Sequence, residues 1–194
     1  MKVFKATNGD MTCTMGKGTF QYRLGEPATA EASKCGGTGL HACEYVADCT
    51  AYYSLKGGNR FFRAEAEGDI AEDGINTRIA CTQLTLVEEL TARGIAREAM
   101  LYILRHPKRE GWEKRAALLC IAGNEARAEE PGGIAIARGK EPRVKGTQGS
   151  VLGLLAETEE GILAARLFEV DGERIPADEW LTVKDLVELE RRTI

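Results

Sequence analysis

Short apolar-containing runs, two of which alternate apolar and polar residues, occupy the first part of the chain, and the first three are followed by Gly, Pro, Asn or Asp, the pattern of strands separated by turns. Four such runs cover residues 3–6, 19–24, 60–66 and 77–86. Between the second and third runs, Val46, Cys49 and Tyr53 recur at helical spacing, which predicts a short helix over residues 45–53. Residues 1–86 are therefore predicted to form a mixed α+β domain.

The hydrophobic period then lengthens to that of an α-helix. Ile95 and Tyr102 belong to one apolar stripe over residues 91–105, and Pro107 prevents the helix from continuing. This segment predicts a connecting helix within residues 87–112.

The remaining residues, 113–194, predict a mainly β region, so the fold class of the whole chain is α+β. Residues 116–156 contain short apolar stretches separated by glycine turns at roughly ten-residue spacing, the pattern of a few rungs of a stacked β-structure. Large apolar side chains are few over residues 116–145, so stacking against a second copy would add buried area, and we expect a homo-oligomer.

The carboxy-terminal tail contains one predicted turn and one segment that fits two structures. Asp171-Gly172 lies between two apolar stretches and predicts a type I′ β-hairpin. Residues 181–194 fit either a second hairpin or a terminal helix capped by Thr182, and periodicity alone leaves both open.

The charge and the cysteine content indicate the cellular environment of the protein and the classes of partner to expect. The 194-residue chain has a net charge of −4 and six cysteines. An acidic chain without a basic segment gives no electrostatic reason to expect duplex nucleic acid as a partner. The start of the chain lacks the apolar stretch of a signal peptide, and no apolar run is long enough to span a membrane. We expect a cytoplasmic protein with reduced thiols and no membrane partner.

Candidate chemistry gathers around Gly36-Gly37-Thr38-Gly39-Leu40-His41-Ala42-Cys43-Glu44 and the following Tyr52-Tyr53. The glycine cluster lacks the Lys-Ser/Thr of a P-loop. His41 is either a ligand-binding or catalytic residue or a partly buried structural histidine.

A metal site is the second alternative for the same segment. The candidates for a zinc site are Cys13, Cys35, His41 and Cys43. None of them has the two-residue separation of a zinc knuckle, and we expect no metal.

Several motifs spread over nearly the whole chain resemble an uncharacterised family of proteins from tailed phages, prophages and bacteria. These motifs are Phe4-Lys5, Asp10-Met11-Thr12-Cys13, Phe20-Gln21-Tyr22, Gly39-Leu40-His41-Ala42-Cys43-Glu44, Tyr52-Tyr53, Val144-Lys145-Gly146 and Val170-Asp171-Gly172-Glu173. The resemblance implies a shortened β-solenoid in the middle of the chain and a phage or prophage origin, and it assigns no activity.

Residues 1–86 also resemble the ADP-ribosyltransferase fold in the order of their motifs. The resemblance implies a site for NAD in which Lys5 stands where a His or Arg belongs, His41 stands where a Tyr or Ser belongs, and Tyr53 is the stacking aromatic. Gly39, His41 and Tyr53 would then contact the cofactor. No glutamate opens the strand over residues 77–86, so the group that would polarise the ribose is missing.

Three functions follow from these observations. We expect a phage- or prophage-encoded accessory protein that binds a host protein, including as an inhibitor of host defence such as an anti-CRISPR. The alternatives are an ADP-ribosyltransferase-like NAD-binding module, active or degenerate, and a phage structural or assembly component. No complete nucleophile, acid/base pair or metal cage can be assembled from the sequence, which favours binding over catalysis, with no cofactor unless NAD is bound.

Overall fold

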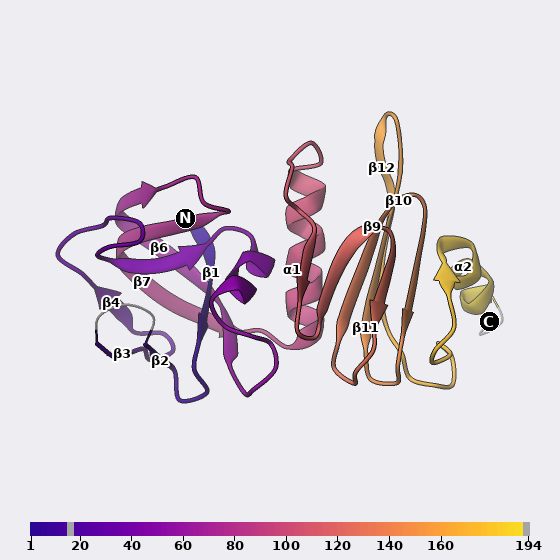
Figure 1. The fold of residues 1–194 in the computed structure, drawn as a ribbon, viewed down its shortest axis with the longest axis horizontal. Coiled ribbons are helices and arrows are strands. Elements are labelled where there is room, and N and C mark those ends of the chain that lie inside the picture. The colour runs from indigo at the N-terminus through magenta and orange to yellow at the C-terminus, as the bar shows by residue number, and fades with distance from the viewer. Residues whose placement is uncertain (15–17, 192–194) are drawn as a thin grey trace. The chain divides into compact units, whose positions relative to one another are not determined.

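The computed structural model describes residues 1–14 and 18–191, and the chain divides into two compact units, Met1–Thr91 and Ala92–Ile194 (Figure 1). Strands outnumber helices in both units, so the predicted α+β class and the mainly β carboxy-terminal region are confirmed. Among the described residues, no helix has the length and apolar character needed to cross a bilayer.

The amino-terminal unit is built on a small closed barrel. Its four strands are β1 (Lys2–Thr7), β5 (Leu40–Cys43), β6 (Arg60–Glu72) and β7 (Arg78–Glu89). β1 lies between β5 and β6, and β7 pairs with both of those strands, which closes the ring (Figure 1). β4 (Pro27–Thr29) pairs with β7 in the antiparallel direction, and β2 (Thr12–Cys13) pairs with β3 (Phe20–Gln21).

The barrel interior mixes small and large apolar side chains. Val3, Ala64, Ile79 and Leu84 are fully buried. A four-stranded barrel has a narrow interior, so it can be filled only when alanines alternate with larger residues.

The segment after β5 forms a single six-residue 3₁₀ helix, η1 (Val46–Ala51). The predicted helical segment is thus present but is shorter and more tightly wound than expected. The strand predicted over residues 19–24 is reduced to Phe20–Gln21.

The carboxy-terminal unit begins with α1 (Ala92–Arg105), one residue after the predicted start. The predicted stripe is buried, since Ile95 and Tyr102 are each less than a tenth exposed. The remaining elements of the unit are β8 (Lys114–Ala116), β9 (Leu119–Ala128), β10 (Ile134–Gly146), β11 (Val151–Thr158), β12 (Gly161–Glu169), β13 (Leu181–Thr182) and α2 (Val183–Arg191).

β9 and β10 each reverse direction within their own length. They pair in parallel from Leu119↔Ile134 to Ala128↔Gly146, yet only five residues separate Ala128 from Ile134. The ends of a straight ten-residue strand lie about 30 Å apart, and the six steps from Ala128 to Ile134 can return no more than about 22 Å. The reversal in β9 occurs at Asn124, whose φ is 53°. Each strand therefore has a first arm and a second arm, and the arms of successive strands stack.

Small side chains fill the space between the two arms. Ala126, Ala135, Ala137, Val144 and Leu152 are buried in one cluster. On the opposite face of the first arms, a Cβ placed on Gly153 would lie 2.7 Å from Met100 Sδ of α1 and 3.1 Å from Ile136 Cγ1. Gly153 thus allows α1 to pack directly on the strands.

The hairpin predicted at Asp171-Gly172 is wrong. β12 ends at Glu169 and pairs with β11, and the next described strand, β13, starts only at Leu181 and pairs with β10. The Asp171 carboxylate accepts the backbone N–H groups of Glu173, Arg174 and Ile175 at 2.8–2.9 Å, so a side chain satisfies the donors that a second strand would have used.

The terminal segment forms a helix. Thr182 donates its backbone N–H and its hydroxyl to the Asp185 carboxylate at 2.8 and 2.7 Å, which is a capping arrangement for α2. Residues 192–194 lie outside the described residues.

The packing of α1 on the strands predicts that Gly153→Val destabilises the protein by about 1–3 kcal/mol, because the new methyl groups overlap Met100 and Ile136. Gly123→Ala, in β9, is the matched control, since its nearest neighbour would be Glu113 Oε1 at an ordinary 3.4 Å. Urea unfolding of the two variants measures the difference, and equal midpoints would contradict the packing.

Candidate functional site

A pocket of about 840 Å³ in the amino-terminal unit contains the residues that the sequence singled out. Its lining includes Lys5 of β1, His41 of β5, Gly39 in the preceding loop, and Tyr53 just after η1. The structure therefore brings together every catalytic and cofactor-binding candidate. The pocket is within the size range of small-molecule sites.

Lys5 is the most buried cation of the pocket. The residue is 8% exposed, and Nζ donates a hydrogen bond to the His41 carbonyl at 2.7 Å. Nζ also lies 5.3 Å from the centre of the Tyr22 ring. An ammonium group has three N–H donors, so Lys5 can hold a ligand oxygen while keeping the bond to His41.

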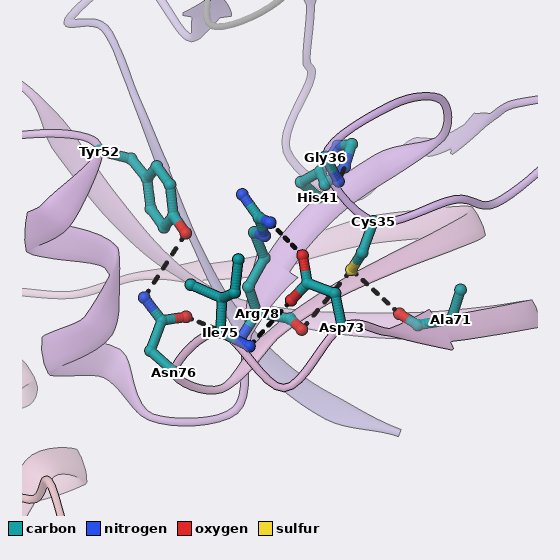
Figure 2. Close-up of polar contacts among 9 residues, drawn as sticks. All are labelled: Cys35, Gly36, His41, Tyr52, Ala71, Asp73, Ile75, Asn76 and Arg78. Atoms are coloured by element: carbon teal, nitrogen blue, oxygen red, sulfur yellow. Dashed lines mark hydrogen bonds and ion pairs between the residues drawn. The ribbon is translucent and has the colours of Figure 1, made fainter.

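His41 is hydrogen-bonded to the glycine loop that precedes it. Its Nε2 accepts the Gly36 N–H at 3.1 Å (Figure 2). Burial is the main cause that lowers the pKa of His41, and the positive charges of Lys5 and Arg78 lower it further. Because Nε2 is an acceptor, the proton of the neutral ring lies on Nδ1.

Arg78 opens β7 and is a site residue that the sequence reasoning missed. Its guanidinium pairs with the Asp73 carboxylate and lies 5.8 Å from the centre of the Tyr52 ring (Figure 2). The Tyr52 hydroxyl in turn accepts a hydrogen bond from Asn76 Nδ2 at 3.5 Å. Arg78 stands near the start of the strand predicted over residues 77–86, at the place where the ADP-ribosyltransferase fold has a glutamate, and this position was the available signal.

Asp48 joins η1 to the start of β7, two segments that lead into side chains of the pocket. Its buried carboxylate accepts the Thr77 N–H at 2.9 Å and the Thr77 hydroxyl at 2.7 Å. Thr77 precedes Arg78, and Asp48 lies in η1, the helix that leads into Tyr52 and Tyr53. The aromatic pair and the arginine are therefore held by one buried hydrogen-bonded link.

The four metal candidates do not form a metal site. Cys13, His41 and Cys43 line the pocket, whereas the Cys35 thiol points to the Ala71 carbonyl at 3.2 Å (Figure 2). Burial, followed by the Asp73 charge, raises the pKa of Cys35, which disfavours the thiolate that a metal needs. Over residues 1–14 and 18–191, no group of three or more His, Cys, Asp or Glu side chains is arranged to hold a metal ion.

The glycine loop is also not an open phosphate cradle. The Gly36 N–H is bonded to His41, and the Gly37 N–H is bonded to the Lys34 carbonyl at 2.9 Å. Gly39 has a φ of 101°, and a Cβ there would lie 2.9 Å from the Ala32 carbonyl oxygen. The loop therefore shapes the wall of the pocket and positions His41.

The lining has a distinctive chemical composition. Among the described residues it contains two cations, Lys5 and Arg78, and no Asp or Glu. It also contains five aromatic side chains, Phe4, Phe20, Tyr22, Tyr52 and Tyr53. Such a lining can hold a negatively charged group and a flat ring, but it offers no carboxylate for acid/base catalysis.

The environment of His41 predicts a pH-dependent stability. Its pKa lies below the ordinary 6.5, so the unfolded chain binds a proton before the folded chain does, and stability falls as the pH drops below 6.5 towards the folded pKa. His41→Gln removes the titrating group. Between about pH 7.5 and about 5.5, the melting temperature of the wild type should fall more than that of the variant. Parallel curves would contradict this. The Asp73 carboxyl, whose pKa is lowered from 3.8, titrates outside this interval.

Comparison with known proteins identifies the amino-terminal part of the chain. No curated protein and no solved structure matches the chain. A family profile described as a domain of unknown function, DUF7666, matches residues 1–98, which include the whole barrel and the pocket. Since this match covers just over half of the 194 residues, the chain belongs to the DUF7666 family.

Proposed function

We propose that the amino-terminal unit binds a phosphate-bearing ligand with a flat ring, of the nucleotide class, in the pocket between Lys5 and Arg78. The observation that carries this proposal is the lining itself: two cations, no carboxylate and five aromatic side chains, in a chain whose net charge is −4. A random patch of an acidic protein would contain carboxylates. A local cationic, aromatic cavity favours an anionic ring compound.

The two cations have different roles in this proposal. Lys5 lies inside the pocket with little exposure, so a phosphate there would interact with it in a poorly hydrated environment, where charge attraction is strong. Arg78 lies over Tyr52 and is paired with Asp73, so it offers its remaining N–H groups at the wall.

Within the nucleotide class, the resemblance to the ADP-ribosyltransferase fold leads us to propose NAD or another ADP-ribose compound. Lys5, His41 and Tyr53 meet in one pocket, which supports this choice. The absence of a carboxylate from the described lining leads us to propose binding without turnover, because nothing in the lining would polarise the ribose.

This proposal predicts that NAD and ADP-ribose raise the melting temperature of the full chain, since a ligand that binds the folded state stabilises it. Lys5→Met should abolish the shift or weaken binding at least tenfold. Lys2→Met, on the same strand but outside the pocket lining, should leave binding unchanged. Isothermal titration calorimetry measures both variants.

Two outcomes would contradict the proposal. One is the absence of any shift at millimolar NAD, ADP-ribose or ADP. The other is equal binding by the Lys5→Met and Lys2→Met variants. Release of nicotinamide from NAD by the wild type would retain the pocket but overturn binding without turnover.

A second candidate is the binding of a host protein by a phage- or prophage-encoded accessory protein in the host cytoplasm, including in the inhibition of host defence. The observation that favours it is the edge of β12, which among the described residues pairs only with β11. The Val170 N–H bonds to the Ser150 carbonyl at 2.9 Å, so alternate backbone groups, those of Ala165 and Leu167, point away from β11. Nearby Leu163 is 69% exposed. Such an edge can accept a strand from another protein.

This candidate predicts that the full chain captures one stoichiometric host protein from lysate and that Ala165→Pro, which removes an outward N–H, loses it. Proline is tolerated at such an edge position, so the melting temperature should stay close to that of the wild type. Equal capture by the wild type and the variant would place the contact elsewhere, and capture of virion proteins alone would favour an assembly role.

A further inference from the structure

The stack of second arms in the carboxy-terminal unit ends at an open edge. The second arm of β10 has β9 on one side and β13 on the other. Within the described part of the chain, no strand pairs with the far side of residues 125–128 of β9, since β8 reaches only Leu119, Cys120 and Ile121. A groove of about 880 Å³ lies along this edge, lined by β9 together with the residues that join β8 to it.

The orientation of the backbone at this edge follows from one hydrogen bond. The Thr147 N–H donates to the Ala128 carbonyl at 3.1 Å, so the backbone groups of Ala128 point towards β10. Backbone groups alternate in direction along a strand. Those of Ala126 therefore also point towards β10, and the N–H and C=O groups of Glu125 and Arg127 point out from the edge.

The side chains of the edge alternate in the same way. Ala126 and Ala128 are buried between the arms, whereas Glu125 and Arg127 are exposed on the outer face. Arg143 binds Glu125 through Oε1 alone, which leaves Oε2 for another donor. The Arg127 guanidinium lies 5.1 Å from the centre of the Trp180 ring, which keeps this charge on the outer face.

We propose that this edge pairs with the same edge of a second copy of the chain, antiparallel and centred on Ala126. In this register Glu125 of each copy lies opposite Arg127 of the other. These are the residues whose backbone groups point outward, so each pair exchanges two N–H···O=C bonds, and the dimer gains four. Cross-strand neighbours of opposite charge also attract, and here both pairs are opposite.

A second copy fits better than an unrelated strand because the edge is complementary to itself. A single-residue shift of the register would place outward-pointing groups opposite inward-pointing ones and would lose the backbone bonds. The alanines and glycines around the groove, including Ala116, Ala117 and Gly133, let another backbone approach closely. The contact is short, so the dimer is weak and forms in a concentration-dependent way.

The experiment is sedimentation velocity of the full chain from micromolar to hundreds of micromolar concentration. The wild type should dimerise as concentration rises. Arg127→Pro removes an outward N–H and should shift the dissociation constant at least tenfold, while the melting temperature stays close to that of the wild type, because proline is tolerated on a solvent-facing edge. Arg23→Glu, at an exposed position of the amino-terminal unit, is a control for the change in net charge made by Arg127→Glu.

A mixing experiment tests the register itself. Arg127→Glu alone and Glu125→Lys alone each create two like-charge pairs, so each variant should be monomeric. An equimolar mixture should dimerise again, because every cross-strand pair then has opposite signs. A wild type that stays monomeric throughout would overturn the proposal and leave the edge to another partner. The proposal would also be overturned if the Arg127→Pro variant dimerised with the same dissociation constant as the wild type, or if the mixture stayed monomeric.

Discussion

The candidate site depends on one buried link, the acceptance of both the N–H and the hydroxyl of Thr77 by the Asp48 carboxylate. The Thr77 hydroxyl also accepts the Tyr45 N–H at 2.9 Å, so the start of η1 is fastened at the same point. Hydrogen bonds to a buried carboxylate are strong, and the loss of their partners is costly. This link joins η1, which leads into Tyr52 and Tyr53, to the start of β7, where Arg78 lies over the Tyr52 ring.

The link also explains how an acidic chain can contain a cationic pocket. The net charge of −4 describes the whole molecule, whereas a bound ligand experiences the groups nearest to it. Asp48 points its Oδ2 at Thr77, and Asp73 is paired with Arg78, so neither carboxylate is part of the lining. Burial is the main cause of the lowered pKa of His41, and the nearby charges of Lys5 and Arg78 lower it further.

The sequence predicted the parts of the fold that depend on local periodicity. The stripe of Ile95 and Tyr102 gave α1 to within one residue at its start, and the alternation after Arg60 gave β6. The hairpin at Asp171 was wrong because a single carboxylate satisfies three backbone donors there, a competition that turn statistics do not reveal. Lys5, His41 and Tyr53 were predicted from motifs, but Arg78 joins them only through the pairing of β5 with β7, which places His41 opposite Ala80. Such long-range pairing has no local signal.

The central claim is that the pocket beside Lys5 takes the phosphate of a ring-bearing ligand. A crystal structure of the full chain with ADP-ribose tests it most directly. We predict a phosphate oxygen within hydrogen-bonding distance of Lys5 Nζ and a ring stacked on one of the pocket tyrosines. An empty pocket at saturating ligand, or ADP-ribose bound elsewhere on the chain, would contradict the account.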